Sequence, residues 1–284
     1  MTMKQIALPF YKKYRCLADK CPLNCCKPYR IGFFKWEAGQ FDTNPLWKDV
    51  DGKGNSIREY LSEDEYGWIL KRNRHGSCIF FEDSMCALQK RNGAMAQPSI
   101  CRTFPRLITR VGNHLELSMD PCCIAVPYLA KDWQLCEFEV KDDNGEPSED
   151  IRCIKREKVF CLLSDAQLTY SNCLEKMAGV YGFSANVSEF HLSEAQENFF
   201  RKMTALLVWG YMIPYDGYPT ITNMMEFIIS LIKNLKTLFE KENVSDDWEE
   251  MSFHFARLLQ DTIVEQNFDM DLEDSYLDMN GSDK

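Results

Sequence analysis

The placement of the cysteines constrains the fold of this chain more strongly than any other feature of its sequence. Thirteen of the 284 residues are cysteine, and nine of these fall between residues 16 and 123. They occur as Cys16-x4-Cys21-x3-Cys25-Cys26, then Cys78-x7-Cys86-x14-Cys101, and then Cys122-Cys123. Cysteines about three to five residues apart can converge on one metal ion or cluster when the chain curls around it. We therefore expect an irregular, ligand-bearing fold for the first half of the chain.

The cellular compartment decides what clustered cysteines mean. The sequence has no run of about 18 to 20 apolar residues, the length that a membrane span needs. Its first residues, MTMKQIALPFYKKYRC, lack the long apolar core of a secretory signal. We therefore expect a soluble, cytoplasmic protein that does not bind membranes. Because disulfides are rare in the reducing cytosol, clustered cysteines there more often bind metal or carry out redox chemistry.

The charge of the chain limits its partners. The formal net charge is −10, whereas nucleic-acid-binding proteins gather Lys and Arg on one face. A nucleic-acid partner is therefore not expected, and an acidic surface is better suited to a protein partner. The acidic residues of the 269–284 segment predict a disordered, solvated tail.

The patterning predicts two regions of different character. Residues 1–135 are rich in Cys, Pro and turn residues and predict a metal- or cluster-binding region, whereas residues 150–268 carry apolar residues at helical spacing. Alternating apolar and polar residues between 106 and 119, on both sides of Gly112-Asn113, predict a β-hairpin. The predicted fold is mainly α with a small β-hairpin, in which an irregular, Cys-rich, metal-binding N-terminal half packs on a helical C-terminal half.

Three long helices are expected in the second region. Ser193 is predicted to cap one of them, with Glu194 and Glu197 in its first turn. Apolar residues recur at helical spacing from Phe227 to Phe239 and again from Trp248 to Ile263. These stripes predict helix faces that pack into a core rather than a cofactor site.

Eight cysteines are candidate metal ligands, and their number leaves the metal open. The candidates are Cys16, Cys21, Cys25, Cys26, Cys78, Cys86, Cys101 and Cys122. Adjacent Cys25 and Cys26 cannot easily bind the same small ion, which indicates two neighbouring centres or a larger cluster. Zinc takes four thiolates and so does a [4Fe–4S] cluster, so counting does not separate them. The spacing is not that of a zinc ribbon, and the Cys-x3-Cys-x2-Cys motif of radical S-adenosylmethionine enzymes would need a cysteine at Pro28.

The last four cysteines of the sequence are set apart from this group. Cys136, Cys153, Cys161 and Cys173 are widely spaced in segments with helical or connecting character. We predict that they are buried thiols, which behave as small hydrophobic side chains.

Three cysteine motifs are specific enough to compare with known families. They are Cys16-x4-Cys-Pro-x2-Cys-Cys, Cys78-Ile-Phe-Phe-Glu-x3-Cys86-Ala-Leu and Cys101-Arg-Thr-Phe-Pro-Arg. Together with Leu8-Pro9-x-Tyr11 and the 115–122 segment, they resemble the flagellin lysine-N-methylase (FliB) family. The resemblance is specific over residues 8–130 and continues weakly beyond them. The same cysteine order also resembles a broader group of Cys-rich proteins that chelate zinc or iron.

The resemblance implies an enzyme that transfers methyl groups from S-adenosyl-L-methionine to lysine side chains of flagellin. It also implies a [4Fe–4S] cluster, with Zn²⁺ as the alternative metal. This sequence departs from the family where Cys123 replaces a proline and where Val208-Trp-Gly-Tyr lacks an arginine. The Gly-rich strand-to-helix motif of nucleotide-type cofactor folds is absent from the sequence. S-adenosylmethionine is therefore expected to bind through the cluster.

Lysine methylation needs a neutral amine, a positioned sulfonium and a route for one proton. Tyr11, Tyr14 and Trp36 lie near the cysteine motifs and are candidate cofactor-binding residues, because aromatic faces attract sulfonium and ammonium groups. Arg102, which follows the candidate ligand Cys101, is a further candidate cofactor-binding residue, because its positive charge can offset the negative charge of a cluster. His191 is the candidate catalytic base.

Two other functions stay open from the sequence. The first is a Cys-rich iron- or zinc-binding or electron-transfer protein without methylase activity. The second is a protein-interaction module with a structural zinc, whose helical half is the binding surface.

Overall fold

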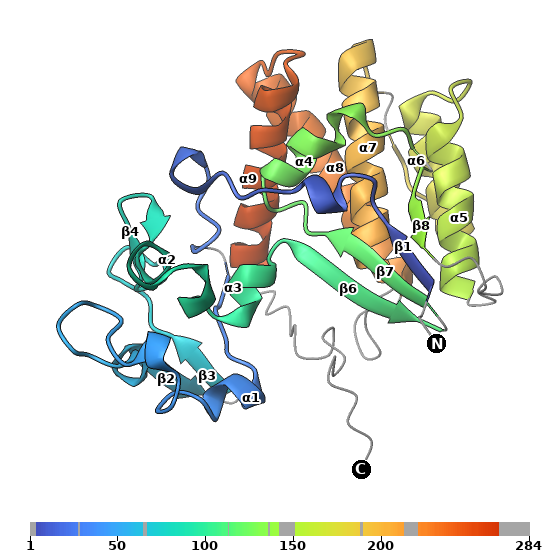
Figure 1. The fold of residues 1–284 in the computed structure, drawn as a ribbon. Helices are drawn as coiled ribbons and strands as arrows, with labels where there is room; N and C mark the ends of the chain where they lie inside the picture. The colour runs from blue at the N-terminus through green and yellow to red at the C-terminus, as the bar shows by residue number, and fades with distance from the viewer. Residues whose placement is uncertain are drawn as a thin grey trace. The chain divides into compact units, whose positions relative to one another are not determined.

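The computed structural model describes residues 4–27, 29–64, 67–112, 114–135, 137–141, 151–187, 190–212 and 221–266 (Figure 1). These residues form two compact units. We call residues 4–15 with 105–259 the sheet unit and residues 16–104, with which residues 260–266 are grouped, the cysteine unit. The predicted acidic tail, residues 269–284, lies outside the described residues.

The sheet unit is built around four strands in the order β6-β7-β1-β8. The strands are β1 (Lys4–Ala7), β6 (Arg106–Val111), β7 (His114–Met119) and β8 (Glu139–Lys141). β6 and β7 pair antiparallel from Arg106↔Met119 to Val111↔His114, which confirms the predicted hairpin. β1 adds to β7 in parallel register, with Lys4 opposite His114, and β8 closes the sheet antiparallel to β1. The sequence analysis did not predict these two outer pairings.

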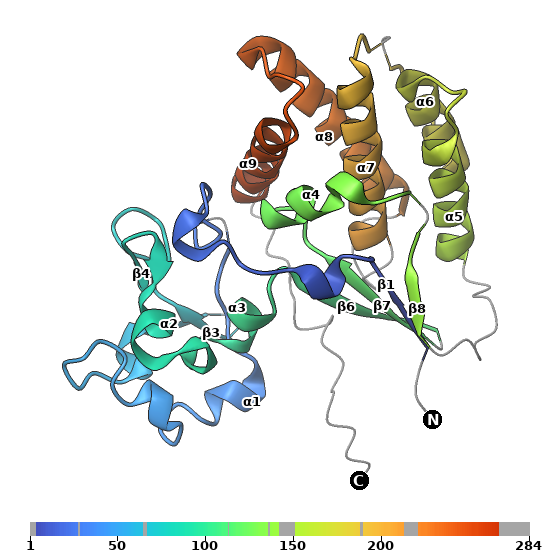
Figure 2. The same cartoon turned by 45° about the horizontal axis from the view of Figure 1, so that its top comes forward.

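Helices lie on one side of this sheet (Figures 1 and 2). They are α5 (Ile151–Ser164), α6 (Tyr170–Val180), α7 (Glu194–Tyr211), α8 (Ile221–Glu242) and α9 (Trp248–Gln266), with the shorter α4 (Ala125–Leu129) before them. The predicted cap is confirmed, because Ser193 Oγ accepts the backbone N–H of Gln196 at 3.1 Å. In the part of the chain that is described, no helix combines the length and apolarity of a membrane-crossing segment.

A buried ion pair joins the sheet to two of these helices. Arg156 of α5 donates to both carboxylate oxygens of Glu116 on β7, at 2.7 and 2.5 Å. The guanidinium carbon of Arg156 lies 4.1 Å from the ring centroid of Trp209 on α7. Because charged groups are buried only when they are paired, this contact fixes the register between sheet and helices.

The cysteine unit consists of short elements joined by loops, as the composition predicts. Its helices and strands are η2 (Ala18–Lys20), α1 (Lys35–Ala38), η3 (Pro45–Trp47), η4 (Ile57–Tyr60), β2 (Leu61–Asp64), β3 (Gly67–Leu70), β4 (Phe81–Glu82), β5 (Met85–Cys86), α2 (Ala87–Asn92), η5 (Ala94–Ala96) and α3 (Ser99–Thr103). β2 pairs with β3, and β4 pairs with β5. None of these elements is long enough to be stable alone, so the unit depends on its core.

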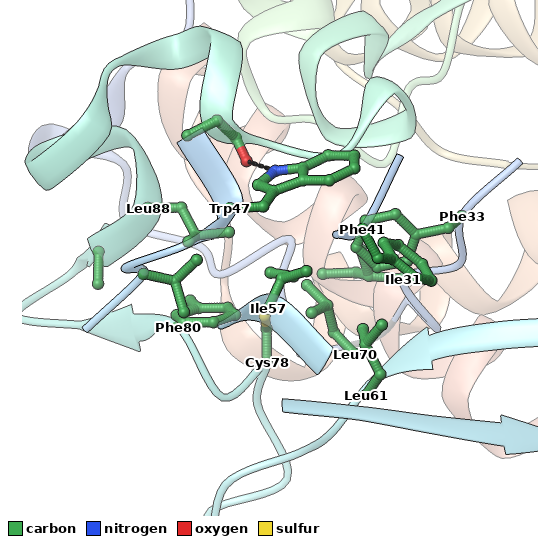
Figure 3. Packing of buried hydrophobic residues seen from close by; sticks show 13 residues of the cluster. Ile31, Phe33, Phe41, Trp47, Ile57, Leu61, Leu70, Cys78, Phe80 and Leu88 are labelled. Atoms are coloured by element: carbon green, nitrogen blue, oxygen red, sulfur yellow. Dashed lines mark hydrogen bonds between the residues drawn. The ribbon is translucent and has the colours of Figure 1, made fainter. Parts of the chain in front are cut away.

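That core combines aromatic and aliphatic side chains (Figure 3). Trp47 packs edge-on against Phe33, with ring centroids 5.7 Å apart, and Phe41 lies 5.1 Å from Phe33. The indole N–H of Trp47 donates to the backbone oxygen of Ala96 at 2.8 Å. This hydrogen bond connects η3 to η5, which leads into α3. Cys78 belongs to the same buried cluster.

The described structure is mainly α-helical with a small sheet, as predicted. Its compact units do not follow the predicted ranges 1–135 and 150–268. The first residues and the hairpin join the helical segments because β1 pairs with β7 across more than one hundred intervening residues.

Candidate metal centre

Two cysteine segments that are distant in sequence are held together by backbone and side-chain hydrogen bonds. The N–H of Cys78 donates to the backbone oxygen of Cys26 at 2.9 Å. Asn24 accepts the N–H of Cys26 at 2.9 Å and donates through Nδ2 to Ser77 Oγ at 3.1 Å. Asn24 therefore shapes the first cysteine loop and fastens it to the segment that carries Cys78.

Arg72 holds the chain immediately after the first loop. Its guanidinium donates to the backbone oxygens of Lys27 and Gly76 at 2.5 Å and to that of Tyr29 at 3.1 Å. Arg72 and Cys78 are also paired by an isolated β-bridge. The positive charge of Arg72 opposes the rise in the pKa of Cys78 that burial causes.

Cys86 and Cys101 reach the same region on short secondary structure. Cys86 pairs with Phe81 in the β4–β5 hairpin and is the residue before α2. Cys101 lies on α3, and both thiols pack against the aromatic core of the cysteine unit.

The start of α3 is held by a buried glutamate. Glu37 is 1% exposed, and its Oε1 accepts the N–H of Ser99 at 2.8 Å. Its Oε2 accepts the N–H of Phe34 at 3.1 Å. Glu37 thereby fixes the helix turn from which Cys101 projects. The sequence analysis did not identify Glu37, Arg72 or Asn24 as site residues.

The thiols of these segments influence one another's ionisation. The Cys26 thiol is hydrogen-bonded to Cys25, which lowers the pKa of Cys25 and raises that of Cys26. Burial raises the pKa of Cys78, and Cys86 and Cys25 add to this effect, so that the pKa is about 11. Burial also raises the pKa of Cys101, and Cys78, Cys86 and Cys25 add to this effect.

Raised pKa values of this kind mean that neighbouring thiols resist ionising together. A metal cation stabilises thiolates, so neighbouring thiols lose their protons when it binds. The donor chemistry of the four thiols Cys25, Cys78, Cys86 and Cys101 fits zinc or an iron–sulfur cluster. As the described side chains are placed, no three His, Cys, Asp or Glu groups come close enough to hold one metal ion.

Cys16 and Cys21 flank the 3-10 turn η2 at the edge of the cysteine unit. Cys16 is exposed, and Cys21 is partly buried. Burial raises the pKa of Cys21, and the neighbouring Cys25 and Cys16 contribute in the same direction. Cys21 is thus electrostatically connected to the central thiols through Cys25.

Cys122 belongs to the sheet unit. It is fully buried, and its N–H donates to Asp120 Oδ1 at 2.9 Å. Tyr211 donates to the same Asp120 oxygen at 2.8 Å, and its hydroxyl lies 4.0 Å from the Cys122 sulfur. The next residue, Cys123, lies 3.8 Å from the Tyr14 hydroxyl.

The predicted cofactor-binding residues are divided between the two units. In the sheet unit, the Arg106 guanidinium carbon lies 4.9 Å from the Tyr14 ring centroid and 5.6 Å from that of Tyr11. The cation that these two rings contact is therefore one of the protein's own. In the cysteine unit, Trp36 is 57% exposed. Arg102 donates to the backbone oxygens of Met95 and Gln97 and to Ser99 Oγ, at 3.1, 3.2 and 2.6 Å.

The remaining candidates are scattered. His191 is exposed and lies two residues before the helix cap Ser193. Cys173 is buried 3.9 Å from the Met177 sulfur, as predicted for a small hydrophobic side chain. The same prediction was wrong for Cys161, which is exposed on α5 because it lies on the outward face of that helix. Cys136 and the side chain of Cys153 lie outside the described part of the structure.

The fold is that of a mainly α protein, and its cysteine unit contains thiols, a type of group that binds metal ions. Its sequence is similar to the lysine-N-methylases of Salmonella typhimurium and Salmonella choleraesuis, each 27% identical over 135 residues. The matched part is 43% of this chain and 31% of each methylase. The flagellar biosynthetic protein FliU of Salmonella muenchen is also 27% identical over 135 residues, which is 75% of its own length.

These similarities confirm the resemblance that the cysteine motifs predict. The chain spans about a third of the length of the two methylases that it matches. No family model matches the chain, and no solved structure matches it.

Proposed function

We propose that this protein is a protein lysine N-methyltransferase that takes its methyl group from S-adenosylmethionine and acts on flagellin. The observation that carries the proposal is the similarity to two proteins named lysine-N-methylase and to a protein named for flagellar biosynthesis. The cysteine unit supports the proposal, because its thiols have the donor chemistry of the metal site that the resemblance implies.

Four thiols of the cysteine unit are proposed to hold a [4Fe–4S] cluster, with Zn²⁺ as the alternative. They are Cys25, Cys78, Cys86 and Cys101. The first three raise the pKa of Cys101, and Cys25 and Cys86 also raise that of Cys78. Cys25 is preferred to its neighbour Cys26 because its lowered pKa favours the thiolate. When bound, the cluster supplies an iron–thiolate centre that offsets the repulsion among these groups.

The reaction itself is a nucleophilic displacement. The lysine nitrogen forms a bond to the methyl carbon while the bond from that carbon to the sulfonium sulfur breaks. S-adenosylhomocysteine leaves as a neutral thioether, and the new ammonium gives up one proton. A free lysine is mostly protonated near neutral pH, so a base must accept a proton before attack. His191 Nδ1 or Nε2 is proposed for this role.

The experiment that tests the proposal measures methyl transfer directly. Purified protein is incubated under anaerobic, reducing conditions with flagellin and S-adenosylmethionine, and flagellin is then analysed by intact-mass spectrometry. We expect additions of whole methyl groups, and peptide mapping places them on lysines. The Cys101→Ser variant is expected to transfer less, while Cys161→Ser is expected to match the unaltered protein. Flagellin whose mass is unchanged under these conditions would refute the assignment.

A second function is favoured by one observation, namely that the four coupled thiols all lie within the cysteine unit. A site assembled in this way needs no methylase chemistry, and the protein could carry or store metal or transfer electrons. In that case bound iron or zinc is expected without methylation of flagellin.

A further inference from the structure

A pocket lies beside the thiol site, within the cysteine unit. Its volume is about 360 Å³, and Cys78 is part of its wall. The segment around Ile31 forms one side of the pocket. This segment lies next to the β2–β3 hairpin, because the N–H of Leu70 donates a hydrogen bond to the backbone oxygen of Ile31 at 2.9 Å. Small-molecule sites in proteins have volumes of roughly 300 to 1,000 Å³. This pocket is therefore large enough for a small ligand or for one end of a larger one.

The polar part of the pocket wall is basic. Arg30, Lys71 and Arg72 all line it, and no aspartate or glutamate is among its lining residues. Arg30 is ion-paired with Asp64, which lies outside the pocket. Lys71 Nζ donates to the backbone oxygen of Glu59 at 2.9 Å.

The charges of Lys71 and Arg72 face carbonyl oxygens in the structure. The three oxygens that accept from Arg72 belong to backbone carbonyls, and so does the oxygen that accepts from Lys71. A carbonyl satisfies a donor without cancelling its charge, so two formal positive charges persist at this wall. A carboxylate gains charge-assisted hydrogen bonds from such groups.

The rest of the wall suits the apolar part of a ligand, one end of which would lie near the sulfur of Cys78. Ile31, Ile69 and Leu70 supply aliphatic surface, and Cys78 of the wall is also one of the four proposed metal ligands. A ligand with a carboxylate at one end and a sulfonium at the other would place its negative charge against Lys71 and Arg72. Its sulfur would then lie on the side of Cys78.

We propose that this pocket binds the amino-acid end of S-adenosylmethionine, with Lys71 and Arg72 recognising its carboxylate. The assignment rests on the proposed methyltransferase function, and it names the residues that select the methyl donor.

The test compares two ligands that differ only in the amino-acid portion. S-adenosylhomocysteine carries the α-amino carboxylate, whereas 5′-methylthioadenosine keeps the nucleoside and the sulfur without it. Binding to the full, metal-loaded chain is measured by isothermal titration calorimetry. The variants are Lys71→Gln and Lys71→Glu, and Lys90→Gln on α2 is the matched control, because Lys90 is exposed and outside the pocket.

We expect Lys71→Gln to weaken S-adenosylhomocysteine binding about tenfold and Lys71→Glu to weaken it further, since a hydrogen bond to a charged group is lost and then replaced by repulsion. Lys90→Gln should bind like the unaltered protein, and 5′-methylthioadenosine should be insensitive to all three changes. Equal S-adenosylhomocysteine affinities in the unaltered protein and both Lys71 variants would overturn the assignment. So would a lack of binding to the unaltered protein.

The flagellin assay separates this outcome from a failure of the proposed function. If the Lys71 variants methylate flagellin with an unchanged KM for S-adenosylmethionine, the pocket assignment is wrong and the function stands. If S-adenosylhomocysteine binds in a Lys71-dependent manner and flagellin stays unmethylated, the pocket assignment stands and the substrate proposal is wrong.

Discussion

Replacing Glu37 by glutamine tests how the chain holds the helix turn that carries Cys101. Both oxygens of Glu37 accept backbone N–H groups, from Ser99 at 2.8 Å and from Phe34 at 3.1 Å. Glutamine keeps one acceptor oxygen and places an NH₂ group where the other oxygen was. One backbone N–H therefore loses its partner, and the remaining hydrogen bond loses its charge.

The size of the effect follows from the burial of this side chain. Glu37 is 1% exposed, and Ser99 is also buried. A hydrogen bond to a charged group contributes about 1.5–3 kcal/mol, and an unpaired buried donor costs about 1–3 kcal/mol. We expect Glu37→Gln to lower the free energy of unfolding by about 2–3 kcal/mol.

Glu59→Gln is the matched control for this prediction. Glu59 also accepts a backbone N–H near the start of a short helix, from Ser56 at 3.2 Å, but it is exposed. Water replaces a lost partner there, so we expect a cost of about 0.5 kcal/mol or less. Urea unfolding followed by tryptophan fluorescence measures both variants. Equal costs for Glu37→Gln and Glu59→Gln would refute the view that Glu37 holds α3 in place.

Three further predictions follow from single contacts. Cys101→Ser is expected to lower metal content and soluble yield together, because ligation and folding are coupled, whereas Cys161→Ser should change neither; metal analysis of the soluble fraction checks this. Burial opposes ionisation of Glu116, but hydrogen bonds led by that from Arg156 outweigh it and lower its pKa. The stabilisation of the fold by ionised Glu116 is therefore complete above the ordinary glutamate pKa of 4.5 and is lost as the pH falls below that value. In acid titrations followed by circular dichroism, the stability of the Glu116→Gln variant should depend less on pH than that of the unaltered protein. At neutral pH the free energy of unfolding of this variant should be lower by about 3–5 kcal/mol, because Arg156 is left unpaired. Ser193→Ala should lower the free energy of unfolding by about 1 kcal/mol in urea, since α7 loses its cap; no change would contradict the cap.

The features that the sequence predicts well are those encoded by neighbouring residues. The hairpin around Gly112 and the cap at Ser193 each depend on a few adjacent positions with strong local preferences. The long helices α8 and α9 follow from apolar spacing alone. In each case the local signal and the packed structure agree, which is the usual condition for a reliable prediction.

The features that the sequence analysis missed depend on contacts between distant segments. β1 becomes a strand by pairing with β7, more than one hundred residues away, and nothing in four residues signals that partner. Arg72 and Glu37 are ordinary charged residues in sequence, and they become important because they bond to Tyr29 and Ser99. The basic pocket was missed for the same reason, since Arg30 and Lys71 line one pocket only because the segment at Ile31 hydrogen-bonds to Leu70 of β3.

The candidate cysteines illustrate both cases. That thiols of separate motifs bind one metal centre stays a prediction, although a backbone hydrogen bond joins Cys26 and Cys78 of two such motifs. The spacing did not indicate that Cys122 is buried in the sheet unit, because that position is set by β7 and α7. Which thiols act as one set is a property of the folded cysteine unit.

Metal analysis of the anaerobically purified chain tests the central claim, a metal centre formed by thiols of the cysteine unit, most directly. Iron, acid-labile sulfide and zinc are measured per chain, together with the visible absorption that thiolate-bound iron produces. We predict iron and sulfide in equal amounts, and we predict that both fall together in Cys25→Ser, Cys78→Ser and Cys101→Ser while Cys161→Ser retains them. Stoichiometric zinc without iron would contradict the cluster, and a chain that binds neither metal would contradict the metal centre itself.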